Sequence, residues 1–181
     1  MPLLSLLSQN KISHSLIPRG SVLLTTIVGS AQSRLLRISK EIAGLVSSLP
    51  LHSASSIFVR ADESRLDVMK ALLTGPPGTP YENGVFVFDI LLPPNYPTER
   101  PEVLIATTGG GTVRFNPNLY KEGKVCLSLL GTWEGPGWDP KISTLLQVLI
   151  SIQSLIMVPN PFFNEPGYDE KSPQWGPSSV K

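Results

Sequence analysis

Apolar residues at helical spacing mark the first regular segment of this chain. From Ala31 to Leu49 they recur every three or four positions, and most charged residues fall on the other side. Pro50 follows at once and cannot continue a helix. The pattern therefore predicts an amphipathic helix over residues 31–49.

Short apolar runs bounded by turn residues predict strands in the next part of the chain. They cover residues 56–60, 85–92 and 103–107. In the second run, alternate residues from Phe86 to Leu92 share one apolar face. Because little chain separates the runs, we expect them to pair as an antiparallel meander.

Residues 62–73 are ambiguous. Asp62 is a good helix cap, and intrinsic propensity favours a helix over residues 66–73. The alternation of Leu66, Val68, Lys70 and Leu72 permits a strand instead. A strand here would give the meander four strands.

The last strong element is a helix predicted over residues 142–158. Ser143 is its candidate N-cap, and Pro159 lies just beyond its end. Its apolar residues nearly encircle it, so we expect heavy burial. Together the elements predict an α+β fold: an N-terminal helix, a four-stranded antiparallel meander and a long crossover helix.

The two ends of the chain differ from its middle in composition. Residues 1–30 are rich in Ser, Leu and Thr and lack acidic residues. We interpret them as a disordered leader, although they faintly resemble a targeting segment. Residues 171–181 are predicted to be a disordered tail. One domain over residues 31–170 remains.

Composition excludes several classes of function. A formal net charge of +1 gives no reason to expect nucleic-acid binding, and no apolar run approaches the roughly 18 residues that cross a membrane. No Cys/His cluster suits zinc, and no histidine lies near the lone Cys126 to make a Cys-His protease. The single cysteine suits a reducing compartment, so we predict a cytoplasmic or nuclear location.

The surroundings of Cys126 indicate chemistry. By itself, a cysteine between Val125 and Leu127 is more often a small buried apolar residue. Here an Asn-Pro-Asn turn precedes it, and Lys121 and Lys124 are close enough in sequence to favour the thiolate. Such a thiol is suited to acyl transfer.

Four motifs in a fixed order extend this interpretation. They are Pro93-Pro-Asn-Tyr-Pro97, Asn116-Pro-Asn118, Gly123-Lys-Val-Cys-Leu127 and a Trp138-Asp-Pro140 turn before the last helix. The ordered set, over about residues 31–168, resembles the ubiquitin-conjugating enzyme family. An inserted loop at residues 132–137 resembles that of the giant inhibitor-of-apoptosis members, and we interpret Trp133 and Trp138 as packing residues of this loop.

The resemblance implies a mechanism. Cys126 would accept the C-terminal glycine of ubiquitin as a thioester from an activating enzyme, and a substrate lysine, often held by a ubiquitin ligase, would then attack it. ATP is consumed by the activating enzyme, so no bound cofactor is expected. Asn118 matches the family's active-site amide and would either donate to the oxyanion or brace the loop. We expect the sulfur to be reachable by solvent and to lie beside this amide.

The resemblance also assigns supporting residues. Asn116 stands where most members have a structural His, and Ser128 replaces a common Asp. Tyr120 matches an aromatic residue that lines the lysine channel. Asn164, or Glu165 beside it, would substitute for an acidic residue that gates the incoming lysine. Most members continue for one or two further helices, which we expect to be missing here.

Two other functions stay open. One is a non-catalytic module of the same fold that binds ubiquitin or client proteins, although the retained Cys126 and Asn118 argue against it. The other is conjugation of a different ubiquitin-like modifier, because Cys-Leu-Ser at residues 126–128 also resembles the SUMO-conjugating enzyme.

Overall fold

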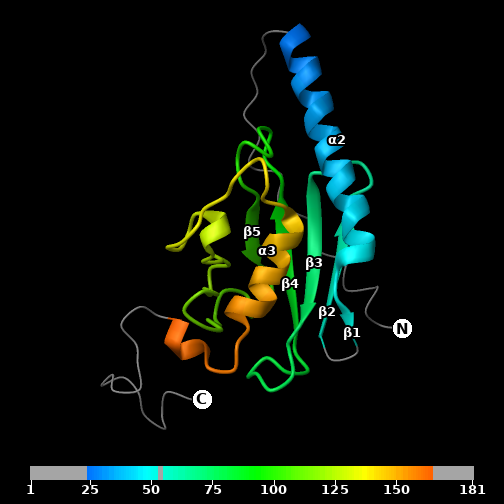
Figure 1. Ribbon diagram of the computed structural model, residues 1–181. Helices are drawn as coiled ribbons and strands as arrows, with labels where there is room; N and C mark the ends of the chain where they lie inside the picture. Colours follow the sequence, from blue (N-terminus) through cyan, green and yellow to red (C-terminus); the bar gives the residue numbers. More distant parts are fainter. Residues whose placement is uncertain (1–23, 53–54, 165–181) are drawn as a thin grey trace.

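A computed structural model of the protein describes residues 24–52 and 55–164. Helix α2 (Leu24–Ser48) and the shorter α3 (Leu145–Ser151) pack on one face of an antiparallel sheet (Figure 1). The predicted first helix is confirmed, but it starts earlier. Residues 24–30, which we assigned to a disordered leader, form its first turns. Residues 1–23 and the predicted tail lie outside the described residues.

The sheet has five strands in the order β1-β2-β3-β4-β5, each antiparallel to the next. The antiparallel meander is confirmed, but the count of four is wrong because β1 adds an edge strand of two residues, too short to leave a periodic signal. The strands are β1 (Leu51–His52), β2 (Ser55–Ala61), β3 (Val68–Thr74), β4 (Val85–Leu91) and β5 (Glu102–Ile105).

The ambiguous segment is a strand. β3 pairs with β2 on one side and with β4 on the other, and Met69, Ala71 and Leu73 are buried against the helices. A helix here would leave β2 and β4 without backbone partners on the sides that face β3, and this cost outweighs intrinsic propensity. Asp62 closes a turn instead, where its Oδ1 accepts hydrogen bonds from the N–H groups of Ser64 at 2.8 Å and Arg65 at 3.0 Å.

The predicted last helix is shorter and differently capped. After α3 the chain continues as a π-helical turn, η2 (Ile152–Ile156). Thr144, rather than Ser143, caps α3: its hydroxyl accepts from the Gln147 N–H, and the Gln147 side chain accepts from the Thr144 N–H. Burial is one-sided, because Ile150 is 40% exposed and Leu155 60%.

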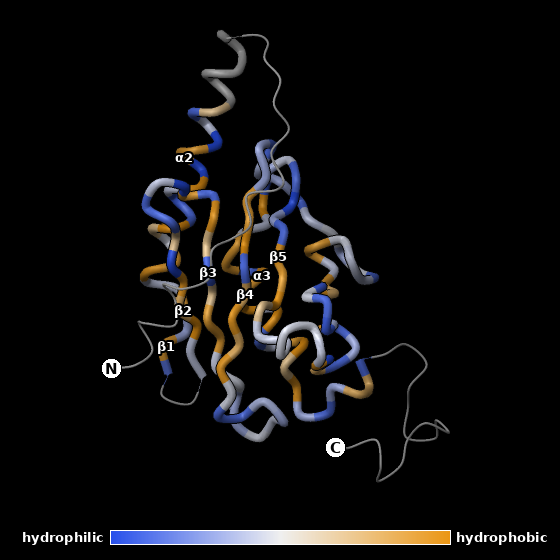
Figure 2. Tube along the Cα trace, turned by 180° about the vertical axis from the view of Figure 1, so that it is seen from behind, coloured by the Kyte–Doolittle hydropathy of each residue, from blue (hydrophilic) through white to orange (hydrophobic). Residues whose placement is uncertain are grey.

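The core fills the layer between the sheet and the two helices, and apolar residues follow the strands and α3 (Figure 2). The helices contribute Ile38, Leu45, Leu145, Val148 and Leu149 to this core, and the strands contribute Ile57, Met69, Leu73, Phe88 and Ile90.

Among the residues described, no helix combines the length and apolarity that crossing a bilayer requires.

The carboxylate of Glu41 joins α2 to two other segments. Its Oε1 accepts from the Tyr96 hydroxyl at 2.5 Å and pairs with Arg37 Nε at 2.5 Å. Its Oε2 accepts from the N–H of Leu145, the first residue of α3, at 2.7 Å. Burial and the hydrogen bond to Glu41 raise the pKa of Tyr96, so its hydroxyl remains a donor. One carboxylate thus fixes α2, α3 and the turn at residues 93–97 relative to one another.

Replacing Glu41 should therefore destabilise the fold. Glu41→Ala leaves Arg37, the Tyr96 hydroxyl and the Leu145 N–H without their shared acceptor, in a place where the Glu41 side chain is only 9% exposed. We expect urea denaturation to show a loss of ~2 kcal/mol in the free energy of unfolding. Glu122→Ala, at a side chain that is 64% exposed, is the control. Equal losses in the two variants would contradict the proposed role of Glu41.

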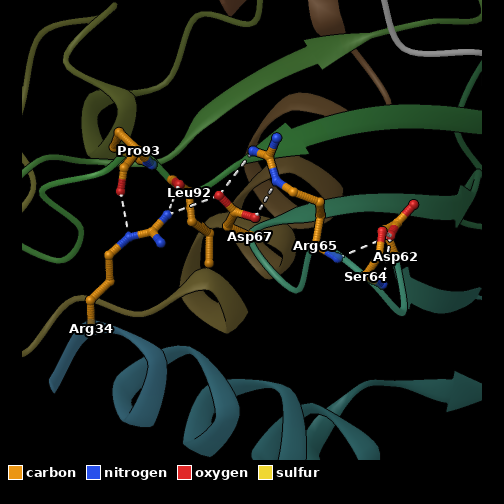
Figure 3. A network of polar contacts seen from close by, with 7 residues as sticks. All are labelled: Arg34, Asp62, Ser64, Arg65, Asp67, Leu92 and Pro93. Atoms are coloured by element: carbon orange, nitrogen blue, oxygen red, sulfur yellow. Dashed lines mark hydrogen bonds and ion pairs between the residues drawn. The ribbon is translucent and has the colours of Figure 1, made fainter. Parts of the chain in front are cut away.

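A second network ties α2 to the end of β4 and to the turn before β3 (Figure 3). Arg34 donates to the carbonyl oxygens of Leu92 at 2.6 Å and Pro93 at 2.9 Å, and to Asp67 Oδ2 at 3.1 Å. Arg65 donates to both oxygens of Asp67, at 3.0 and 3.1 Å. Burial acts to raise the pKa of Asp67, but the hydrogen bonds from Arg65 and Arg34 outweigh it and leave the pKa below its usual range.

This lowered pKa predicts acid sensitivity. As the pH falls, the unfolded chain takes up a proton at Asp67 near its ordinary pKa of about 3.9, before the folded protein does. The stabilisation is present above that pH and is lost as the pH falls through the folded value. Urea denaturation should therefore show the stability difference between wild type and Asp67→Asn shrinking from pH ~5 to ~2. A stability difference between wild type and Asp67→Asn that stays constant over this pH range would contradict the prediction.

Candidate active site

The segment that leads to Cys126 lies along the edge strand β5. The Ile105 N–H donates to the Gly123 carbonyl at 2.8 Å, and Leu104 and Lys124 form an isolated antiparallel bridge. Gly123 has a φ of +97°, and a Cβ there would lie 3.1 Å from the Ile105 oxygen. The glycine between the two lysines is therefore needed for the turn that places Cys126.

Cys126 is not a member of the main core cluster, although its neighbours Val125 and Leu127 belong to it. However, Cys126 is only 2% exposed, so the expectation that solvent reaches the sulfur is wrong for this structure. Acyl transfer at Cys126 would therefore require the groups that cover this residue to move.

Asn118 lies beside Cys126, as predicted. Its backbone oxygen accepts from the Cys126 N–H at 2.8 Å, and its side-chain Nδ2 donates to the Cys126 carbonyl at 3.0 Å. Asn118 is 5% exposed, and its Oδ1 has no hydrogen-bond partner among the residues described. The amide thus braces the backbone of the thiol residue in this structure. Donation to an oxyanion stays a prediction.

Asn116 holds the turn that carries Asn118. Its Oδ1 accepts from the N–H groups of Asn118 at 2.7 Å and Leu119 at 2.8 Å. Its Nδ2 donates to the Tyr81 hydroxyl at 2.8 Å and to the Ile156 carbonyl at 3.2 Å. These contacts tie the Asn-Pro-Asn turn to the end of η2. They match the structural role that the resemblance assigns to Asn116.

Tyr120 lies against two cations. Arg114 Cζ is 4.1 Å and Lys124 Nζ is 5.5 Å from the centroid of its ring, distances suited to cation–π contact. Tyr120, Arg114 and Lys124 therefore form a group beside the Asn-Pro-Asn turn that is both basic and aromatic. A role for Tyr120 in guiding a substrate lysine stays a prediction.

The other two predicted support residues lie on short helical turns. Ser128 opens η1 (Ser128–Leu130), and its carbonyl accepts from the Gly131 N–H at 2.8 Å. Asn164 ends η3 (Pro161–Asn164), and its Nδ2 donates to the Leu155 carbonyl at 3.3 Å. The gating role of Asn164 stays a prediction, and Glu165 lies outside the described residues.

The inserted loop is fixed at both of its ends. The Trp138 indole donates to the Pro97 carbonyl at 2.7 Å and its ring lies 5.6 Å from that of Tyr96, so its predicted packing role is confirmed. At the other end, the Thr132 hydroxyl binds the backbone on both sides of Cys126. Sequence reasoning missed Thr132, because a threonine in a loop gives no pattern that singles it out.

The comparison with known families agrees with this geometry. The sequence model of the family described as "Ubiquitin-conjugating enzyme" matches residues 37–172. The chain belongs to this family.

Several relatives are similar over most of this chain. The human dual E2 ubiquitin-conjugating enzyme/E3 ubiquitin-protein ligase BIRC6 is 56% identical over 77% of the chain. The probable ubiquitin-conjugating enzyme protein 17 of Caenorhabditis elegans is 53% identical over 76% of it. The solved structure of human ubiquitin-conjugating enzyme E2 G1 has a TM-score of 0.57 and 30% identity, and the match covers 71% of this chain and 98% of that one.

The curated relatives are far longer than the matched region. The match covers 3% of human BIRC6 and 19% of the Caenorhabditis elegans protein. It covers 38% of human ubiquitin-conjugating enzyme E2 Z, which is 49% identical over 78% of this chain. The shared part is the α+β domain of the ubiquitin-conjugating enzyme family described above.

Proposed function

We propose that this chain accepts ubiquitin as a thioester on Cys126 and transfers it to a lysine of a protein substrate. One observation carries the proposal. The chain belongs to this family, and the backbone carbonyl of its single cysteine, Cys126, accepts a hydrogen bond from the side chain of Asn118 in the Asn-Pro-Asn turn.

The chemistry runs in two acyl transfers. In the first, the Cys126 thiol loses its proton and its sulfur attacks the carbonyl carbon of the C-terminal glycine of ubiquitin; the thioester bond to the activating enzyme breaks, and the thiolate of that enzyme leaves. In the second, a lysine amine attacks the same carbon, the Cys126 thiolate leaves, and the amine loses a proton. The attack of the amine in the second step passes through an oxyanion, which the Asn118 amide would stabilise if it turns from the Cys126 carbonyl towards the reacting carbon.

The proposal names its partners. They are ubiquitin, a ubiquitin-activating enzyme that consumes ATP, a ubiquitin ligase and the protein substrates. No cofactor bound to this chain takes part. The location we propose is the cytoplasm or the nucleus, where thiols stay reduced.

A loading reaction tests the proposal. The protein is mixed with activating enzyme, ATP and ubiquitin and separated on a non-reducing gel, with omission of ATP as control. We expect a ubiquitin adduct that a thiol reductant removes. A parallel reaction with the activating enzyme of another ubiquitin-like modifier and that modifier tests the alternative substrate.

A second candidate function rests on the burial of Cys126, which is only 2% exposed. If the sulfur stays covered, the domain would act as a non-catalytic module that binds ubiquitin or client proteins. Folded protein that binds ubiquitin and forms no adduct would favour this module over the enzyme.

A further inference from the structure

Two residues hold all four backbone polar groups beside the Cys126 Cα. In the peptide group that precedes it, the Cys126 N–H donates to the Asn118 oxygen at 2.8 Å, and the Val125 carbonyl accepts from the Thr132 hydroxyl at 2.8 Å. In the peptide group that follows, the Cys126 carbonyl accepts from Asn118 Nδ2 at 3.0 Å, and the Leu127 N–H donates to Thr132 Oγ1 at 2.9 Å.

The chain reverses to bring Thr132 back to this position. η1 is followed by Gly131 in the left-handed region, with φ 60° and ψ 24°. The Thr132 N–H then donates to the Leu127 carbonyl at 3.3 Å. A Cβ on Gly131 would lie 3.2 Å from the Arg100 guanidinium, so the reversal is also closely packed.

A hydroxyl is suited to this place because it donates and accepts at once. A lone pair of the Thr132 hydroxyl accepts from the Leu127 N–H, and its proton is best placed for the Val125 carbonyl, at 2.8 Å against 3.3 Å for the Leu127 carbonyl. With both peptide groups held, rotation about the backbone bonds of Cys126 is restricted. The direction of its Cα–Cβ bond, from which the sulfur extends, is therefore fixed before any reaction begins.

We propose that Thr132 is a positioning residue for the Cys126 thiol: it clamps the backbone from the side opposite Asn118 and touches no reacting atom. The effect of Thr132 on ubiquitin transfer rests on the proposed function. The effect of Thr132 on the exposure of the Cys126 sulfur does not rest on it, because restricted exposure follows from the four hydrogen bonds alone.

Three variants test the clamp. Thr132→Val keeps the shape of the side chain and removes the hydroxyl, whereas Thr132→Ser keeps the hydroxyl. Thr74→Val is the matched control, because the Thr74 hydroxyl also accepts from a backbone N–H, that of Ser56 at 2.7 Å, but lies on β3.

The first readout needs no partner protein. Without the clamp, the covered sulfur should open more often, so iodoacetamide should alkylate Cys126 about 5-fold faster in Thr132→Val. Thr132→Ser and Thr74→Val should match wild type. Equal rates in Thr132→Val and wild type, or an equal increase in either other variant, would overturn the proposal.

The second readout separates positioning from binding. In Thr132→Val, kcat for loading should fall about 10-fold while KM for ubiquitin stays the same, because a displaced sulfur slows the reaction without removing a contact to ubiquitin. A rise in KM with unchanged kcat would overturn the proposal. If wild type forms no thioester, the proposed function fails, and alkylation still decides the role of Thr132.

A measurement on wild type covers the case in which Thr132→Val does not fold. Hydrogen exchange should show the Leu127 amide protected, and Thr132→Ser should keep that protection. Rapid exchange of this amide in folded wild type would overturn the clamp.

Discussion

Cys126→Ala should abolish the ubiquitin adduct completely, and Cys126→Ser should form an adduct that survives reductant. Alanine offers no nucleophile, whereas serine offers a hydroxyl that gives an oxygen ester. Both are measured on reducing and non-reducing gels after incubation with activating enzyme, ATP and ubiquitin. The chain has one cysteine, so any adduct of wild type that reductant removes is assigned to this residue.

The two variants also serve as controls for folding. Because each change removes or replaces one small side chain, both proteins should keep the circular dichroism spectrum of wild type. A reductant-sensitive adduct that persists in folded Cys126→Ala would show that the proposed thioester does not form here.

Asn118→Ala should slow transfer from the loaded enzyme to free lysine by about 100- to 1000-fold, while the thioester still forms. The loss corresponds to ~3–4 kcal/mol, the usual cost of removing one donor to an oxyanion. Single-turnover discharge of purified thioester measures it. Asn118→Asp should be similarly slow, because it keeps the shape of the side chain and lacks the Nδ2 donor.

The structure also provides an alternative outcome. Asn118 Nδ2 donates to the Cys126 carbonyl, so the amide braces the loop before any reaction. If loading collapses together with discharge in Asn118→Ala, bracing is its role and the oxyanion prediction is wrong. Asn95→Ala is the control, because the Asn95 amide donates only to exposed Glu99, at 3.0 Å, and should leave both steps unchanged.

Elements with a strong periodic pattern were predictable from the sequence. The helix predicted over residues 31–49 and the strand predicted over residues 85–92 have an apolar face that only one type of element can bury. β3 was not decided by its own residues, because pairing with both β2 and β4 is a property of the assembled sheet. The first turns of α2 and the two-residue β1 have no such face.

The candidate site divides in the same way. The nearness of Asn118 to Cys126 was predictable because the motifs occur in a fixed order, although eight positions separate the two residues. The burial of Cys126 was not, because the exposure of a residue depends on how the assembled fold packs around it and not on its own motif. Thr132 and Glu41 were missed for the same reason: each acts on backbone groups of a distant or reversed segment.

The two anchored stems of the inserted loop have a practical consequence. Thr132 fixes one stem to the segment of Cys126, and Trp138 fixes the other to Pro97. Residues 134–137 between them are exposed. A fluorophore or an epitope grafted into this tip would therefore report on a partner that approaches the loop, while the two anchors keep the graft from disturbing the backbone at Cys126.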